Sequence, residues 1–422
     1  MISTLLTRGE RGRGEKPRRL CAIVHADFPS DPRVLRAVRV AVEQGWEVDV
    51  LATRQPGERA KEVVEGAHVR RLPITHRRGR GALRVAAEYL GFTLLATVHA
   101  SRLARRRRYS TVHVHNPPDF LIVAATVPKL LGAKVIFDVH DLSDDMFAMR
   151  FGNRRGAEFV DRILRLLESA ATRFADFVIT VHEPYRHELA RRGVSPEKTT
   201  VVMNTVDERL LPPARRATPG NGFRIVYHGT VTPPYGVNLL VEAVAMLAAD
   251  VPDARLEIYG DGDAVPEIRT LIERLAVSDR VAVSEGYLPH AEVLERVQRA
   301  SVGVIPNLPV RFNRLALSTK LFEYVALGIP VVCADLGAIR EHFSDSEVLF
   351  FEAGRPEALA STLLETWRDP AAAAARSQAA LRRYEAYRWP AQARRYAEVL
   401  DRSVADPRRH RRYASAVSGR GR

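Results

Sequence analysis

Cysteine is nearly absent from this chain of 422 residues. The two cysteines, Cys21 and Cys333, each lie in an apolar run that is typical of a buried strand. They cannot form a zinc site by themselves, and cysteines placed in this way are expected to be reduced core residues. The cysteine content therefore favours a cytoplasmic location.

Long apolar runs are missing as well. The first eight residues have too short an apolar core for a secretory signal peptide. No stretch reaches the length of a membrane span, and the nearest, residues 85–100, contains Glu88 and His99. We therefore expect neither a signal peptide nor a membrane-spanning helix.

The glycine fingerprint of dinucleotide-binding proteins is absent from the place where it would be expected. Residues 20–25 are predicted to form the first strand, and the loop at residues 27–34 follows it. This loop lacks the Gly-x-Gly-x-x-Gly pattern that would bring backbone close to a pyrophosphate. The absence argues against a dinucleotide site in the first part of the chain.

Positive charge, in contrast, is abundant. The net charge is +14 and the pI is about 10.1, which favours an anionic partner such as a nucleotide, a phospholipid surface or a nucleic acid. A protein that binds nucleic acid would interleave its arginines with aromatic residues. Here the arginines lie mostly in the two ends of the chain and in two clusters, residues 77–80 and 105–108. No specific nucleic acid is therefore expected.

Short apolar runs alternate with helical patterns, which predicts two α/β domains built on parallel sheets. A proline- and glycine-rich stretch follows the first series, and the alternation then restarts. Each series should form a doubly wound domain, with a ligand between them at the carboxyl ends of the strands. The predicted strands are residues 20–25, 47–52, 112–115, 134–139, 177–181 and 199–203, then 224–228, 255–259, 280–283, 302–306 and 330–334.

The two ends of the chain are basic and poor in apolar residues, which predicts disorder there. The expected organisation is a disordered N-terminus (1–18), a Rossmann-like domain (19–206), a linker (207–222), a second Rossmann-like domain (223–388), a C-terminal helix (389–405) and a disordered tail (406–422).

Residues 318–332 are the most informative motif. They predict a helix that Ser318 can cap, so that the N–H groups of Thr319 and Lys320 would point outward, with positive charge from Lys320 beside them. Glu323 follows one turn later, where its carboxylate could accept two hydrogen bonds from a ribose diol. A phosphate holder and a diol acceptor at this spacing suit a sugar nucleotide. The alternative is an ordinary α/β helix with a surface glutamate.

This motif resembles the donor site of glycosyltransferase family four, the retaining group 1 glycosyltransferases with the GT-B fold. The resemblance covers about residues 19–404. It implies two Rossmann-like domains that face each other across a cleft, with the C-terminal helix crossing back onto the first domain. It also implies a nucleotide-sugar donor and retention of anomeric configuration. Neither a metal nor another cofactor is expected.

Two further stretches resemble donor-binding segments of the family. In residues 227–236, Gly229 would let backbone approach the donor diphosphate, but Thr230 and Tyr235 stand where the family usually has arginine and lysine. Tyr259 precedes a Gly-Asp-Gly turn in the segment that lies near the base, although such turns are common for structural reasons alone. Leu315 replaces the first of the two glutamates of the donor motif.

The missing cations could be compensated by Lys320, Arg311 or Arg314. A plain turn between strand and helix is the alternative interpretation of residues 227–236.

The catalytic candidates lie in the first domain. Residues 134–139 are a predicted strand, and His140 and Asp141 follow it, where a catalytic group is expected in a parallel sheet. His140 matches a family histidine close to the transferred sugar, and Asp141 could orient its ring. The alternative is a pair of residues that caps the next helix.

The acceptor-side candidates are His115, Asn116 and Asp119 at the end of the preceding strand, and Arg33 in the loop at residues 27–34. Arg33 could meet an acidic acceptor, although an exposed arginine at a helix start is the simpler interpretation. Helix capping by Asn116 or Asp119 is likewise an alternative. His113 and His115 share one strand face, but no third ligand is evident nearby, so no metal site is predicted.

The two arginine clusters flank residues 85–100. An amphipathic helix with basic ends can lie on an anionic membrane surface, whereas the alternative is a core helix with solvated charges at its ends.

These observations predict a nucleotide-sugar-dependent, hexosyltransferase-like enzyme that acts on a glycan or lipid-linked acceptor in cell-envelope polysaccharide or glycoconjugate synthesis. Its expected place is the cytoplasm, at the inner face of the plasma membrane. One alternative is a degenerate GT-B protein that binds a partner without catalysis, which the residues at Thr230, Tyr235 and Leu315 favour. The other is a basic protein whose charge is its function.

Overall fold

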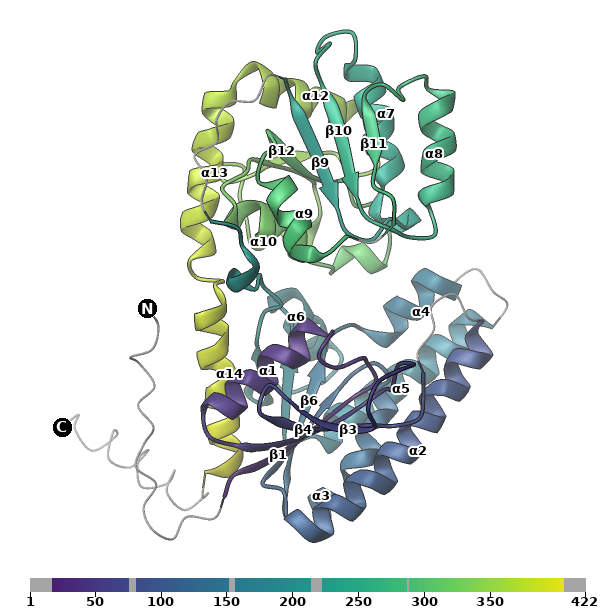
Figure 1. The fold of residues 1–422 in the computed structure, drawn as a ribbon, viewed down its shortest axis with the longest axis vertical. Helices are drawn as coiled ribbons and strands as arrows, with labels where there is room; N and C mark the ends of the chain where they lie inside the picture. The colour runs from purple at the N-terminus through teal and green to yellow at the C-terminus, as the bar shows by residue number, and fades with distance from the viewer. Residues whose placement is uncertain (1–16, 76–80, 152–155, 214–221, 287, 406–422) are drawn as a thin grey trace, which may run out of the picture. The chain divides into compact units, whose positions relative to one another are not determined.

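The computed structural model describes residues 17–75, 81–151, 156–213, 222–286 and 288–405. The arginine cluster at residues 77–80, residues 214–221 of the predicted linker, and the chain before residue 17 and after residue 405 lie outside the described residues. The chain divides into two units: Met1–Met203 with Gln392–Arg422, and Asn204–Ala391. Each unit contains one sheet flanked by helices (Figure 1).

The first unit is built on a sheet with the strand order β3-β4-β2-β1-β5-β6-β7-β8 among the described residues. All neighbours pair in parallel except β3 and β4, which form an antiparallel hairpin at one edge. The central strands are buried on both faces, as expected for a parallel sheet covered by helices. The strands are β1 (Arg19–Val24), β2 (Glu47–Ala52), β3 (Lys61–Val64), β4 (Ala67–Arg71), β5 (Thr111–His115), β6 (Lys134–Val139), β7 (Phe177–Thr180) and β8 (Thr199–Val201).

The helices of this unit connect successive strands. Helix α1 begins at Pro32 because the Asp31 carboxylate accepts the N–H groups of Arg33 and Val34. The helical segments are α1 (Pro32–Glu43), α2 (Ala82–Arg107), η1 (Asp119–Ala125), α3 (Thr126–Leu130), α4 (Ser143–Phe151), α5 (Ala157–Phe174), α6 (Glu183–Arg191) and η2 (Pro196–Lys198).

The C-terminal helix α14 (Trp389–Val404) belongs to the first unit from Gln392 onward. Its side chains bond to two parts of the first unit: the Gln392 Oε1 accepts the N–H of Met203, which follows β8, and the hydroxyl of Ser403 is 2.7 Å from that of Thr111, at the start of β5. The chain thus returns to its first unit at its end, where the sequence predicts a crossing helix.

In the described part of the second unit, six parallel strands form one sheet with the order β11-β10-β9-β12-β13-β14. The strands are β9 (Arg224–His228), β10 (Arg255–Tyr259), β11 (Val281–Val283), β12 (Val302–Ile305), β13 (Val331–Ala334) and β14 (Leu349–Phe351). The helical segments are η3 (Glu208–Leu210), η4 (Pro233–Tyr235), α7 (Val237–Leu247), α8 (Val265–Arg274), α9 (His290–Val297), η5 (Phe312–Arg314), α10 (Thr319–Ala326), α11 (Gly337–Arg340), α12 (Pro356–Arg368) and α13 (Pro370–Tyr384).

The start of the predicted linker is ordered within the second unit. Residues 208–210 form η3, which contacts α9, and the Arg388 guanidinium holds the Glu208 carboxylate through two bonds of 2.8 and 2.7 Å. The division between the units falls after Met203, a few residues before the predicted linker.

Both cysteines are free and buried, as the sequence predicts. Burial raises the pKa of each thiol, so neither is a reactive thiolate. Among the described residues no helix combines the length and apolarity that a bilayer span needs.

Candidate active site

The donor-side candidates gather where β9 ends and α10 begins. Gly229 has a φ of +102°, and a Cβ built on it would lie 2.3 Å from the Lys320 Cε. A side chain at residue 229 would therefore displace Lys320, which explains the glycine. Ser318 occupies the N-cap position of α10, but its hydroxyl makes no capping bond, contrary to expectation.

Lys320 lies between two tyrosine rings. Its Nζ is 4.8 Å from the ring centre of Tyr227 and 4.5 Å from that of Tyr235, and it donates a hydrogen bond of 3.1 Å to the Tyr227 hydroxyl. Burial lowers the pKa of Lys320 to about 8, against the opposing effect of the Glu323 carboxylate. Tyr227 in turn donates to the carbonyl of Thr230, so its hydroxyl is fixed from both sides.

Glu323 is a buried carboxylate between two imidazoles. Its oxygens lie 3.2 Å from the Nε2 of His228 and 3.1 Å from the Nε2 of His290. Burial alone would raise the pKa of Glu323, but the hydrogen bond from His290 and the nearby His228 and Lys320 lower it. The carboxylate is therefore ionised at neutral pH, as a ribose acceptor should be.

The two histidines are site residues that the sequence reasoning missed. His228 directly precedes Gly229 at the end of β9, and that strand-end position was an available signal. His290 opens α9, and nothing in the local pattern marks it. Burial lowers the pKa of His228 to about 4, whereas the bond to Glu323 raises that of His290.

Tyr259 and Leu315 are the two other donor-side positions that the sequence singles out. Tyr259 ends β10 in register with His228, and its hydroxyl donates to Glu257, so that burial and this bond raise its pKa to about 12. Leu315, at the position of the family's first glutamate, is buried.

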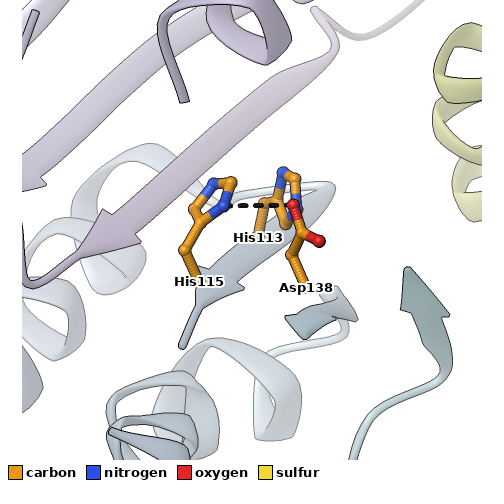
Figure 2. Close-up of side chains that lie close together, drawn as sticks. All are labelled: His113, His115 and Asp138. Atoms are coloured by element: carbon orange, nitrogen blue, oxygen red, sulfur yellow. Dashed lines mark ion pairs between the residues drawn. The ribbon is translucent and has the colours of Figure 1, made fainter. Parts of the chain in front are cut away.

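The first unit brings three imidazoles, those of His113, His115 and His140, around the Asp138 carboxylate near the ends of β5 and β6. Figure 2 shows His113, His115 and Asp138 of this group. The Asp138 Oδ2 is 3.3 Å from His115 Nδ1 and from His140 Nε2, and 3.6 Å from His113 Nε2. His115 Nδ1 and His140 Nε2 are themselves 3.0 Å apart, so one of these two nitrogens carries the proton that they share. His113 is bonded to the hydroxyl of Tyr396 on α14.

Arg33 is a buried partner of Asp138, which corrects the simpler interpretation of an exposed helix-start arginine. Its guanidinium donates two bonds of 3.0 and 2.7 Å to the carboxylate and a third to the Val202 carbonyl. Although burial raises the pKa of Asp138, Arg33 and His140 hold it well below its usual range. Arg33 is thus occupied within the protein and is not presented to an acidic acceptor.

Asp141 does not orient the His140 ring, because Asp138 fills that role. Asn116 joins the two strand ends: its Oδ1 accepts the His140 N–H, and its Nδ2 donates to the Asp141 carbonyl and to Asp119. Burial raises the pKa of Asp141, and it raises that of Asp119 to about 6. Asn116 and Asp119 therefore fix the loop that carries His140.

His113, His115 and Asp138 are close enough to hold a metal, so Asp138 is the third group that the sequence did not reveal (Figure 2). The imidazoles of His113 and His115 are neutral because burial lowers the pKa of each ring. However, Arg33 already bonds both oxygens of Asp138, and a divalent cation would be buried beside that guanidinium. The arrangement fits a hydrogen-bond network better than a metal centre.

Comparisons with known proteins place both units in described families. Residues 30–205 match the model of the glycosyl transferase 4-like domain, and residues 222–369 match that of glycosyl transferases group 1. The D-inositol 3-phosphate glycosyltransferase of Kineococcus radiotolerans is 24% identical over 392 residues, which cover 86% of this chain and 88% of that protein. The alpha-D-kanosaminyltransferase of Streptomyces kanamyceticus is 24% identical over 315 residues, covering 70% and 79%.

Solved structures share the fold. Sucrose-phosphate synthase from Thermosynechococcus elongatus is similar with a TM-score of 0.73 at 19% identity, covering 91% of this chain and 98% of that chain. Anabaena Alr3699/HepE in complex with UDP-glucose is similar with a TM-score of 0.68 at 16% identity, covering 91% and 99%.

Proposed function

Because this chain belongs to the GT4-like, group 1 glycosyltransferases and has their GT-B fold, we propose that it moves a sugar from a nucleotide-sugar donor to a glycan or lipid-linked acceptor at an anionic membrane surface. The enzyme class follows from the family. The transfer is proposed to retain anomeric configuration and to serve cell-envelope polysaccharide or glycoconjugate synthesis, from the cytoplasmic side of the plasma membrane.

The donor assignment depends above all on the cluster of Gly229, Lys320 and Glu323 in the second unit. Gly229 leaves room for the Lys320 side chain, and the Lys320 ammonium, held beside the glycine by the Tyr227 hydroxyl, supplies positive charge for a phosphate. Glu323, one turn further along α10, is kept ionised by its neighbours and can accept the hydroxyls of a ribose. A nucleotide sugar offers a diphosphate and a ribose at this spacing. The UDP-glucose complex of Alr3699/HepE supports this choice of donor.

The chemical step is assigned to His140 in the first unit. Asp138 and His115 fix one nitrogen of its ring, and Asn116 fixes its backbone N–H. A ring held at two points is pre-organised to contact the transferred sugar. Asp138, Asn116 and Asp119 act as positioning residues for His140, and no step requires a metal.

The acceptor proposal rests on an exposed apolar face of the first unit. On α2, Leu83, Leu90 and Leu94 lie on one side and are 88%, 61% and 66% exposed. Segment η1 packs against both α2 and α5 and exposes Val123. On α5, Phe159, Ile163 and Leu166 form a second exposed stripe at helical spacing. The α2–η1–α5 face, defined by these seven residues, is larger than a scatter of single surface residues.

The positive charge of α2 favours a lipid surface as the partner of the α2–η1–α5 face. The exposed charged side chains described in α2 are all arginines, because its one acid, Glu88, is buried against His25. Arg102 and Arg105 continue the outward stripe of the leucines. Apolar residues bordered by arginine match the boundary between acyl chains and anionic headgroups. A lipid-linked acceptor would then be presented where the enzyme is bound.

The donor proposal is tested by a thermal-stability screen of nucleoside diphosphates and nucleotide sugars against the wild type and Glu323→Ala. We expect one nucleotide series to raise the melting temperature of the wild type but not of the variant. Stabilisation of neither protein by any compound would refute the donor proposal and favour a degenerate binding protein. Product anomers, determined by NMR, would then test retention.

A further inference from the structure

Tyr235 stands where relatives of this family usually have a lysine, and its ring contacts the one cation that the donor motif retains. The Lys320 ammonium lies 4.5 Å from the ring centre of Tyr235 and 4.8 Å from that of Tyr227. Both distances are within the range of a favourable interaction between a cation and an aromatic ring. Two tyrosines therefore contact a single ammonium group.

The two tyrosines come from different parts of one strand-to-helix connection. Tyr227 is a fully buried residue of β9, and Tyr235 is a half-buried residue at the end of η4. The hydroxyl of Tyr227 accepts a hydrogen bond from Lys320 and donates one to Thr230. Where relatives usually have an arginine and a lysine, this chain has Thr230 and Tyr235, and the second ring and the hydroxyl come from Tyr227 in the preceding strand.

The rings also offset an unfavourable effect of burial on Lys320. Burial lowers the pKa of Lys320 to about 8, so a fraction of this lysine is uncharged near neutral pH. The groups that face it are the Glu323 carboxylate, which favours the charged form, and His228, which is neutral because burial lowers its pKa to about 4. Aromatic faces and the Tyr227 hydroxyl add favourable contacts with the ammonium without adding charge.

We propose that Tyr227 and Tyr235 are positioning residues that hold the Lys320 ammonium over Gly229, so that one fixed cation meets the donor diphosphate in place of the family's usual arginine and lysine. This inference rests on the proposed donor site. A free lysine would sample many rotamers, whereas a lysine held between two rings is pre-organised and loses less entropy when the phosphate binds. Thr230 and Tyr235 are then part of an alternative phosphate site and not signs of a degenerate one.

A double-mutant cycle between Lys320 and Tyr235 tests the proposal in the full-length enzyme. Tyr235→Phe keeps the ring and is the matched control, whereas Tyr235→Leu keeps an apolar side chain and removes the ring. We expect Tyr235→Phe to stay near the wild-type kcat/KM for the donor and Tyr235→Leu to lose about ten-fold. In the Lys320→Ala background, Tyr235→Leu should have little further effect, because the ring then has no ammonium to hold.

The dependence of activity on pH gives a second test, because a purely structural role of Tyr235 would not shift this dependence. Activity that needs the ammonium falls as pH rises through the pKa of Lys320. Without the ring the charged form is less stable, so the alkaline limb of Tyr235→Leu should move to lower pH, whereas that of Tyr235→Phe should not. Far-ultraviolet circular dichroism and melting temperature confirm that both variants are folded.

The proposal would be overturned if Tyr235→Phe and Tyr235→Leu had equal activity. It would also be overturned if Tyr235→Leu lowered activity as much in the Lys320→Ala background as in the wild type. The donor site itself is judged separately by Glu323→Ala. If Glu323→Ala weakens nucleotide binding but the effects of Lys320→Ala and Tyr235→Leu are additive, the positioning role of the tyrosines is rejected and the donor site is kept. No nucleotide binding by the wild type would reject both.

Discussion

Glu323 is the carboxylate of the donor-side cluster, and it pairs with two imidazoles, those of His228 and His290, in a largely buried position. His228, His290 and Lys320 all lie around its carboxylate, and together they keep it ionised despite burial. An ionised carboxylate in this position can accept hydrogen bonds from the hydroxyl groups of a ligand. It also binds His290 in the free protein, so a ribose would have to share or replace that bond.

Replacing Glu323 by alanine should weaken nucleotide binding by about 1.5–3 kcal/mol, the value of hydrogen bonds to a charged group. Isothermal titration with the nucleotide selected by the stability screen measures the change. Glu292→Ala, which removes an exposed carboxylate paired with Arg296 on α9, is the matched control. Unchanged affinity in Glu323→Ala would remove this residue from the donor site.

His290 should make stability depend on pH. Its pKa is raised above 6.5 by the bond to Glu323, so the protonated form favours the folded state. The stabilisation is complete below pH 6.5 and is lost as pH rises through the raised pKa. The melting temperature of the wild type should therefore exceed that of His290→Gln at acidic pH, and the difference should shrink as the pH rises above 6.5. A difference that does not change with pH would contradict this assignment.

His140 should serve chemistry more than folding. His140→Ala is expected to remain folded, to bind the donor nearly as well as the wild type and to lose most of its turnover, because its ring is half-buried while Asp138 keeps Arg33 as a partner. Turnover, nucleotide affinity and melting temperature are measured on the same preparation. Transfer near the wild-type rate would make His140 a structural residue.

At the scale of single elements, strongly patterned strands were predictable. The strands at residues 47–52, 134–139, 224–228 and 255–259 have the predicted bounds, because their buried positions carry apolar residues in a strand pattern. Strand β3 was missed because it is an exposed edge strand. Its turn to β4 uses Glu65 and Gly66, both with positive φ, and a glutamate at such a position carries no turn signal. Strand β14 has three residues, too few for a pattern.

The candidate site was predictable in part for a different reason. Strand-end positions can be located from local pattern, and they identify His115, His140 and Gly229. Partners that are distant in the sequence cannot be found in this way. Arg33 pairs with Asp138 across 105 positions, and His113 meets Tyr396 across 283. The sequence predicted an exposed Arg33 because an arginine at a helix start is usually solvated.

Helix α2 supports a prediction about membranes. Wild-type protein should sediment with vesicles that contain anionic phosphatidylglycerol and not with neutral vesicles. Arg102→Gln with Arg105→Gln should weaken binding by about 2 kcal/mol, roughly thirty-fold, at about 1 kcal/mol for each cation near the surface. Leu90→Glu with Leu94→Glu should abolish it, because charge would enter the apolar contact.

Matched controls lie in the second unit. Arg269→Gln with Arg274→Gln removes two exposed arginines from α8, and Met246→Glu changes an exposed apolar residue of α7. Both should bind vesicles like the wild type. Binding that ignores lipid charge, or that falls equally in the controls, would refute the docking of the α2–η1–α5 face. Self-association of the wild type that Leu90→Glu with Leu94→Glu reverses would instead assign the face to a second copy of the chain.

At the scale of the whole molecule, the two units carry different parts of the proposed reaction. The second unit holds the donor-side candidates, and the first holds His140 with its network and the α2–η1–α5 face, for which we propose contact with lipid. The strong positive charge of the chain, +14, suits both a nucleotide donor and an anionic surface. The residues at Thr230, Tyr235 and Leu315 distinguish this chain from the usual family pattern, so the remaining cation, Lys320, should bear more of the diphosphate charge than it does in relatives.

Release of nucleoside diphosphate from a nucleotide sugar, in the presence of anionic vesicles that carry a lipid-linked acceptor, tests this account most directly. The wild type should release it, and Lys320→Ala should reduce the rate by roughly two orders of magnitude or more, the scale of losing one pre-organised donor to a developing anion. Thr230→Arg with Tyr235→Lys should restore part of that loss in Lys320→Ala. Near-normal release by Lys320→Ala, or no release by the wild type with any nucleotide sugar, would contradict the account.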